Sequence, residues 1–245
     1  MQLFLGIPPE YLCDIHAVSQ AKETAQILYS ALVDSGLPSG PFTATVDGEL
    51  KELKPYARVW NHPCVAWAGS SLHALMWTLV HLIQICHEYQ KRYGRRHLCS
   101  HHADQLCVHI NRHVEELTCK LGTSKDPADW LAKLSPKQRT SVEPRVSTLN
   151  SPPSVGYGVA CIDDEFRVHV NGQIDLEESY RKFYVYKARF KFPMKWNKSF
   201  SVPSNLQNAF AQYYPNQPVI TKRQLKRQRG ERSSGESVES VESVE

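Results

Sequence analysis

The stretch "LCDIHAVSQAKETAQILYSAL", residues 12–32, has a clear helical pattern near the start of the chain. Its apolar residues recur at the spacing of one helix face: Val18, Ala21, Ala25, Leu28 and Leu32. Asp14 is a suitable N-cap, and Gly36 and Pro38 follow the last apolar position. The sequence therefore predicts a helix over residues 14–34.

One row of this predicted helix is polar. It consists of His16, Gln20 and then either Glu23 or Thr24, one residue per turn. A solvated helix face normally carries Lys and Glu, so this composition indicates the wall of a functional site. The alternative is that His16 only makes a local hydrogen bond near the start of the helix.

Length and composition limit the class of protein. The chain has 245 residues, of which 41% are hydrophobic, enough for a sizeable core. An apolar run long enough to cross a membrane is absent, and the N-terminus lacks the basic region of a signal peptide, so we expect a cytosolic chain without a membrane partner. Seven cysteines without small-scaffold spacing fit reduced thiols. The net charge of +4 is too small to indicate a nucleic-acid partner by itself.

The remaining pattern is mostly helical. Further helices are predicted at 65–89, 101–121 and 175–191, and the segments 35–57 and 135–158 have the composition of loops. The predicted fold class is mainly α, with a single bundle-like helical domain over residues 1–200 and little sheet. A small hairpin is expected through Asn171-Gly172.

Residues 201–245 are expected to form an extended or disordered tail. Within it, residues 222–229 hold five basic residues in eight, and residues 236–245 repeat an acidic three-residue unit. The basic run is either a nucleic-acid patch or a solvated tail without a specific ligand. The acidic repeat would compete with phosphate for the basic residues.

Two groups in the helical part are candidates for binding or proton transfer. Glu88, Arg92 and His97 come together near a predicted helix end, where Arg can hold a phosphate and Glu or His can handle a proton. In the preceding helix, His73 and His81 are either hydrogen-bonded core residues or part of a polar pocket beside tryptophans.

Two further segments have more than one interpretation. Residues 99–113 are rich in Cys and His, and His109 and His113 have the spacing to share a metal on a helix. Because no CxxC pair supplies the other half of a zinc site, a histidine-rich helix surface is favoured, and no metal or cofactor is expected. Residues 175–190 interleave aromatic and basic side chains, which suits phosphate binding beside base stacking or an ordinary amphipathic helix.

The order of these motifs resembles a family of small, mostly uncharacterised proteins of tailed bacteriophages. The resemblance covers roughly residues 2–197. The matching positions are Cys13-Asp14 with His16, Glu23-Thr24-Ala25-Gln26, Asn61-His62-Pro63, Trp67, Ser70, Glu88, Arg92-Tyr93-Gly94 with His97, Asp164-Glu165-Phe166, Tyr180, Tyr184, Lys187 and Trp196. Ile15 and Ser19 depart from the pattern, since the family has lysines there.

The resemblance implies a function in the cytoplasm of an infected host. Similar phage enzymes act in the hypermodification of thymine, in which an amino acid or another amine displaces phosphate from phosphorylated 5-hydroxymethyluracil in DNA. That reaction needs a base for the amine, cations for the leaving phosphate and a pocket for a flipped nucleobase of the viral DNA. Fold-level analogy carries little information about chemistry.

By this resemblance, one set of residues is expected to be catalytic and another to bind the substrate and its phosphate. The expected catalytic residues are His16, as the base, with Asp14, Glu23 and Glu88. The expected binding residues are Arg58, Trp60, Asn61, His62, Trp67, Arg92, Tyr93, His97, Tyr184 and Lys187.

The alternative function is a phage protein without catalysis that binds nucleic acid or a host factor. Clustering of His16, Glu23, Arg58, Glu88 and Arg92 in one concave pocket would favour the enzyme. Scattered positions beside a basic surface would favour the binding protein. The sequence does not indicate the donor amine or the oligomeric state.

Overall fold

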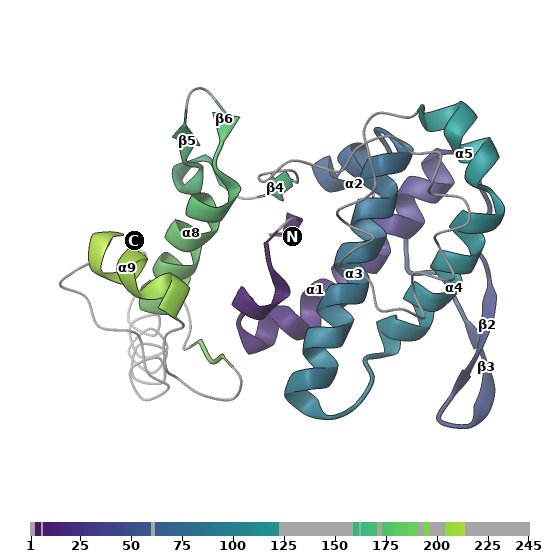
Figure 1. Ribbon diagram of the computed structural model, residues 1–245, viewed down its shortest axis with the longest axis horizontal. Coiled ribbons are helices and arrows are strands. Elements are labelled where there is room, and N and C mark those ends of the chain that lie inside the picture. Colours follow the sequence, from purple (N-terminus) through teal and green to yellow (C-terminus); the bar gives the residue numbers. More distant parts are fainter. Residues whose placement is uncertain are drawn as a thin grey trace, which may run out of the picture.

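A computed structural model of the chain describes residues 3–5, 7–59, 62–122, 159–161, 163–170, 173–190, 194–196 and 204–213. The described residues form seven α-helices, two short 3-10 helices and three two-stranded antiparallel sheets, which confirms the prediction of a mainly helical fold (Figure 1). The helices are α1 (Asp14–Asp34), α2 (Pro63–Ala68), α3 (Leu72–Tyr93), α4 (Leu98–Arg112), α5 (Val114–Leu121), α8 (Leu176–Phe190) and α9 (Ser204–Tyr213). The strands are β1 (Leu3–Leu5), β2 (Phe42–Val46), β3 (Glu49–Leu53), β4 (Val159–Cys161), β5 (His169–Val170) and β6 (Gln173–Ile174). The 3-10 helices are η1 (Pro9–Tyr11) and η2 (Asp164–Phe166).

Helix α1 has the bounds that the sequence predicts, but its buried surface differs from the prediction. Gln20 and Thr24, on the polar row, are buried with 1% and 0% of their surface exposed, whereas Val18, on the apolar row, is 42% exposed. The reason is that α1 packs against α2, α3 and α4 together, so its buried surface is wider than one apolar stripe. Helix α3 runs antiparallel to α1, because Asp14 at the start of α1 meets Arg92 near the end of α3.

The two long helices predicted after residue 63 are each divided. The first stops at Ala68, and Ser71 then caps α3 by accepting a hydrogen bond from the amide of Ala74 at 3.1 Å. The second is divided at His113 into α4 and α5. These breaks let α2 and α5 change direction while α3 and α4 stay packed on α1.

The prediction of a loop over residues 35–57 is wrong. Strands β2 and β3 form a hairpin there, in register from Phe42 opposite Leu53. Its turn is Asp47-Gly48, and both residues have positive φ angles, 54° and 83°, as a tight two-residue hairpin turn requires. The hairpin packs beside α4 and becomes one side of the groove described below.

The C-terminal part agrees with the sequence over the β5–β6 hairpin and helix α8, and differs in the tail. The segment expected to be extended from residue 201 contains α9, which packs on α8. Among the described residues, no helix is both long enough and apolar enough to cross a membrane. The predicted loop at 135–158, the basic run at 222–229 and the acidic repeat at 236–245 lie outside the described residues.

The N-terminal segment joins the helical bundle to α8 and α9, and it lies between them in Figure 1. Strand β1 pairs with β4, more than 150 residues later in the chain. The backbone carbonyl of Tyr11 accepts hydrogen bonds from the Tyr180 hydroxyl and from the Trp196 indole, the latter at 3.0 Å. The amide of Asp14 donates to the carbonyl of Lys195 at 2.8 Å. The segment that leads into α1 is therefore held by hydrogen bonds from residues more than 160 positions later in the chain.

Gly94 ends α3 with a left-handed conformation, at a φ angle of 70°. We expect Gly94→Ala to lower the free energy of unfolding by about 1 kcal/mol, because alanine is disfavoured at positive φ. An added Cβ would contact nothing within 4 Å, so the cost is conformational rather than steric. Urea denaturation measures it, and Gly94→Asn is the control, since asparagine tolerates this conformation better. Equal losses in both variants would contradict the explanation.

Candidate functional site

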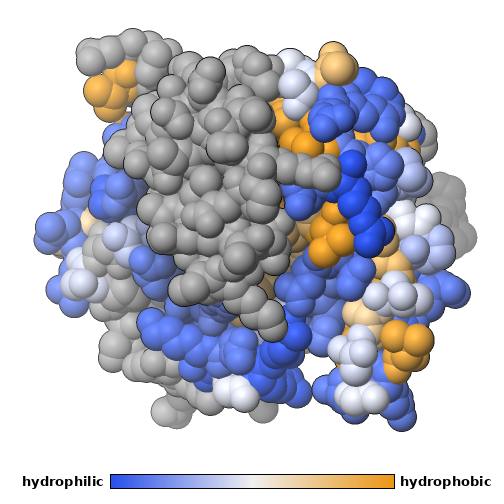
Figure 2. All heavy atoms as spheres, turned by 45° about the vertical axis from the view of Figure 1, so that its right-hand side comes forward, coloured by the Kyte–Doolittle hydropathy of each residue, from blue (hydrophilic) through white to orange (hydrophobic). Residues whose placement is uncertain are grey.

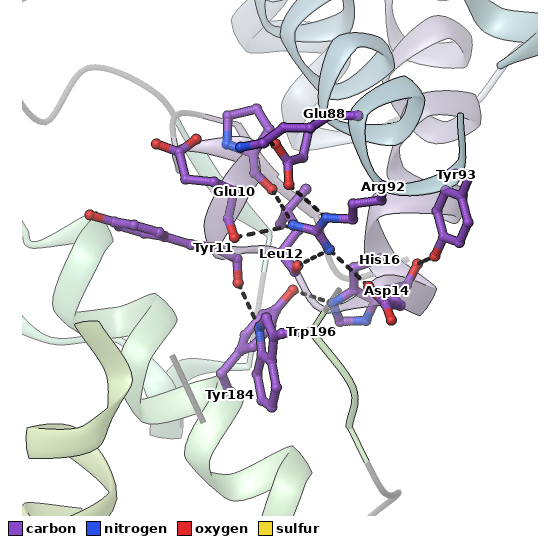
Figure 3. A network of polar contacts seen from close by, with 12 residues as sticks. Glu10, Tyr11, Leu12, Asp14, His16, Glu88, Arg92, Tyr93, Tyr184 and Trp196 are labelled. Carbon is purple, nitrogen blue, oxygen red and sulfur yellow. Dashed lines mark hydrogen bonds and ion pairs between the residues drawn. The ribbon is translucent and has the colours of Figure 1, made fainter. Parts of the chain in front are cut away.

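Arg92 lies at the centre of a polar network at the start of α1 (Figure 3). Its guanidinium group has five N–H bonds, and the structure provides five acceptors for them. Nε donates to the Glu88 carboxylate at 2.6 Å, and Nη1 donates to the Leu12 carbonyl at 2.7 Å and to the Asp14 carboxylate at 3.1 Å. Nη2 donates to the carbonyls of Pro9 and Glu10, at 3.3 and 3.1 Å.

This network holds the N-terminal segment against α3. The side chain of Arg92 is 3% exposed, and the side chains of Glu88 and Asp14 are 13% and 14% exposed. Two carboxylates face one guanidinium, and all of its donors are used within the protein. The geometry therefore supports a structural role for Arg92 instead of the expected phosphate contact, because no N–H remains for a phosphate.

His16 and Tyr184 connect α1 to α8. Nδ1 of His16 shares a hydrogen bond with the Tyr184 hydroxyl, and the rings meet edge to face with 5.2 Å between centroids. Burial, with a smaller contribution from nearby Lys187, lowers the pKa of His16 from 6.5 to about 4, so the imidazole is neutral at pH 7. Glu23 lies seven residues further along α1, about 10 Å in the axial direction, too far to orient His16 directly.

The other expected site residues lie apart from this network. Arg58 pairs with Asp34 at the opposite end of α1, about 30 Å from Asp14. His62 caps α2 through a hydrogen bond from the amide of Cys64, and Trp67 packs edge to face against Trp77. Trp60 and Asn61 lie outside the described residues. The expected residues that the structure describes therefore do not form one concave pocket.

Tyr93 and Lys187 lie nearer to the network, in contacts with aromatic rings. The Tyr93 hydroxyl is 3.5 Å from the backbone carbonyl of Asp14, and its ring packs on Tyr89 with 4.6 Å between centroids. Nζ of Lys187 lies over the Phe183 ring, 5.0 Å from its centroid. Both side chains pack along the junction between α1 and its neighbours.

The Cys- and His-rich helix α4 packs into an aromatic cluster. Nδ1 of His102 shares a hydrogen bond of 2.7 Å with the buried Tyr29 hydroxyl, and Sγ of Cys99 lies 3.3 Å from the Tyr56 hydroxyl. The rings of His109 and Phe42 are 5.2 Å apart. Within the described ranges, no three His, Cys, Asp or Glu side chains are placed to hold a metal ion.

A basic groove lies between the α3–α4 turn and the β2–β3 hairpin. Its volume is about 740 Å³, and its lining residues are Thr45, Val46, Asp47, Tyr89, Arg95, Arg96, His97, Leu98 and His101. The turn supplies two adjacent arginines, of which Arg95 donates to the Tyr89 hydroxyl at 3.2 Å and Arg96 pairs with Asp104 at 2.8 Å. The Arg96–Asp104 pair is about half exposed, so Arg96 can exchange that partner for a ligand at a cost below about 1 kcal/mol.

Two histidines complete the basic groove. His97 accepts a hydrogen bond from the amide of Cys99 at 3.0 Å, which caps α4 and fixes the imidazole at the groove. Burial lowers the pKa of His97 and of His101, and the positive charges of Arg95 and Arg96 lower them further. The two imidazoles are therefore neutral near pH 7, and the arginines carry the positive charge. A bound anion would reverse part of this effect and favour imidazolium.

Comparisons with known proteins were made by family model, by sequence and by structure. None gives a significant match. The bacteriophage family suggested by the motifs therefore stays a prediction.

A second cavity lies along α3, beside η1. Its volume is about 580 Å³, and its lining residues are Ile7, Pro8, Pro9, Glu10, Trp77, Val80, His81, Gln84, His87, Glu88 and Lys91. Glu88, one of the expected catalytic residues, therefore lines this cavity and also pairs with Arg92. His16 lines neither this cavity nor the basic groove.

Sequence reasoning missed Arg95 and Arg96 as functional candidates, and it considered His101 only as one of the histidines of the Cys- and His-rich segment 99–113. The signal was present, because two adjacent arginines follow the glycine that ends a helix and precede a capping histidine. This pair of arginines could not be assigned to a groove from the sequence, because the β2–β3 hairpin that forms the other side of the groove was not predicted. His97 is the expected binding residue that does line it.

Proposed function

We propose that this protein binds nucleic acid, with backbone phosphate held in the basic groove between the α3–α4 turn and the β2–β3 hairpin. The observation that carries the proposal is the convergence of Arg95 and Arg96 with His97 and His101 in one hollow. Guanidinium groups match phosphate oxygens in charge and geometry, and Arg is enriched wherever phosphate is recognised.

The described surface includes a mainly hydrophilic face. On the face shown in Figure 2, hydrophilic side chains predominate outside the grey atoms, and apolar side chains form separate small patches. Asp47 is the only acidic residue among the described residues that line the groove, against two arginines. Once Arg96 exchanges its exposed partner Asp104 for a ligand, this balance favours an anion over a cationic or apolar ligand.

The test is the double substitution Arg95→Ala with Arg96→Ala in the full chain. Binding of a labelled oligonucleotide, followed by fluorescence anisotropy, is expected to weaken about 100-fold, the loss of two charge-assisted contacts. The slope of log affinity against log salt is expected to flatten by about 1.5, since each phosphate contact contributes roughly 0.7–0.9.

The matched control is Arg181→Ala with Lys182→Ala on α8, which removes the same charge from the aromatic and basic helix. That variant is expected to keep wild-type affinity and salt slope. If the α8 variant lost binding while the Arg95 and Arg96 variant kept it, the nucleic-acid surface would be α8 and the proposal would be wrong.

A second candidate function is the transfer of an amine to phosphorylated 5-hydroxymethyluracil in viral DNA, in the host cytoplasm. One observation favours it: the cavity along α3 brings the Glu88 carboxylate together with His81 and His87, groups able to accept a proton from an amine. Nucleoside mass spectrometry of DNA from phage with and without this gene tests it. Unchanged nucleoside composition would count against the reaction and would leave the binding proposal standing.

A further inference from the structure

A third hollow lies next to both the cavity along α3 and the basic groove. This small hollow, of about 50 Å³, shares His87 with the α3 cavity and Arg96 with the basic groove. The three hollows therefore have neighbouring linings along α3 and at its C-terminal end. Trp77 in the α3 cavity and Tyr89 in the basic groove lie about 18 Å apart along α3, a span that suits an extended chain rather than a single small molecule.

One wall of the α3 cavity is aromatic. The rings of Trp77 and His81 are stacked, with 5.4 Å between centroids and 16° between planes. Trp67 supports Trp77 from the side, at 5.5 Å. Stacking of a base on such a platform is worth about 1–3 kcal/mol and does not depend strongly on the base. The volume of about 580 Å³ lies in the usual range for small-ligand pockets.

Further along α3, and on η1, the same cavity is lined by hydrogen-bond acceptors. Glu10 and Glu88 contribute carboxylates, and Gln84 contributes an amide that can donate or accept. Oε1 of Glu88 is used by Arg92, whereas Oε2 is 3.7 Å from the exposed amine of Lys91. Carboxylates accept hydrogen bonds, so this part of the cavity matches a base with an exocyclic amino group, such as cytosine, adenine or guanine.

We infer that the α3 cavity receives an unpaired nucleobase bearing an exocyclic amino group, from the same single strand whose phosphate lies at Arg95 and Arg96. This inference rests on the proposed function, because the basic groove anchors the strand. A paired base has its edge occupied by its partner, so a single strand, and not a duplex, is the ligand.

The experiment compares three labelled oligonucleotides of equal length with the full-length protein. Oligo-dC and oligo-dU are a matched pair, because they differ in presenting an amino group or a carbonyl, and an abasic strand carries the same phosphates without bases. Oligo-dC is expected to bind about tenfold more tightly than oligo-dU, and the abasic strand more weakly than both.

Two substitutions locate the effect in the cavity. Trp77→Leu is expected to bring oligo-dC and oligo-dU to the affinity of the abasic strand, a loss of about 10–100-fold for oligo-dC. Glu10→Gln is expected to reduce the preference for oligo-dC severalfold. Because Glu10 is exposed and only its backbone carbonyl contacts Arg92, this second variant tests the cavity without affecting folding.

The outcomes separate this inference from the proposed function. Equal affinity for all three strands, lost in the Arg95 and Arg96 variant, would overturn the base pocket and leave phosphate binding in place. Tighter binding of oligo-dU would overturn the preference for an amino group and favour the uracil-modifying reaction. An Arg95 and Arg96 variant that binds like the wild type would overturn the proposed function itself.

Discussion

Arg92→Ala is expected to lower the free energy of unfolding by about 3–5 kcal/mol. The substitution leaves the Asp14 and Glu88 carboxylates without their buried countercharge, at 14% and 13% side-chain exposure. It also removes the donors from three backbone carbonyls of the N-terminal segment. Breaking a buried pair by removing one partner costs more than the pair contributes, because the other charge stays buried.

Urea denaturation of two further variants shows whether the loss comes from this network. Arg58→Ala removes an exposed arginine that pairs with Asp34, and it is expected to cost less than about 1 kcal/mol. Arg92→Lys keeps the charge but has only three donors for five acceptors, so most of the loss should remain. A cost for Arg92→Ala no larger than that for Arg58→Ala would show that the network does not hold the N-terminal segment.

Acidification from pH 7 to pH 5 is expected to lower stability by about 2 kcal/mol for each of two histidines, His16 and His102. Burial lowers the pKa of each from 6.5 to about 4, with smaller contributions from Lys187 and His101 respectively. The unfolded chain therefore binds more protons than the folded chain between pH 6.5 and pH 4. Stability is full above pH 6.5 and decreases as the pH falls through this window.

Asparagine substitutions isolate the contribution of these two imidazoles. Asparagine can replace the Nδ1 contact, so His16→Asn and His102→Asn can keep a hydrogen bond to Tyr184 and Tyr29 without a group that titrates. In thermal denaturation, the double variant should lose less stability than the wild type when the pH is lowered from 7 to 5. If the double variant lost as much stability as the wild type, groups other than these two histidines would cause the pH dependence.

Much of the secondary structure could be predicted, because its signals lie within a few residues. The spacing of the apolar residues and the position of Gly36 predict the bounds of α1, and the Asn171-Gly172 pair in the sequence predicts the β5–β6 hairpin. The N-cap predicted at Asp14 is wrong, because Cys13 holds that position and Asp14 is the first residue of the helix. The β2–β3 hairpin was missed although Asp47-Gly48 is a hairpin signal, because nearby Gly and Pro residues made the whole segment resemble a loop. When a hairpin turn signal and loop-forming residues occur in the same segment, tertiary packing decides which structure forms.

The candidate site was less predictable than the helices. The sequence placed Glu88 and Arg92 one helical turn apart, which is local geometry, and they do pair. Arg92 also binds the carbonyls of residues about 80 positions earlier, and those contacts use the donors that a phosphate would need. Whether an arginine binds phosphate or has a structural role therefore depends on backbone atoms that are distant in the sequence. A short sequence motif does not contain those atoms.

By itself, the sequence determined that the chain is mainly helical and where α1 and α8 lie, since capping and periodicity act over distances of one or two turns. The tertiary structure alone decided that Gln20 is buried and Val18 exposed, because burial depends on how many elements surround a helix. It also decided that Arg95 and Arg96, rather than Arg92, face a hollow. That hollow exists only because a hairpin and a helix–helix turn, more than 40 residues apart in the chain, pack side by side.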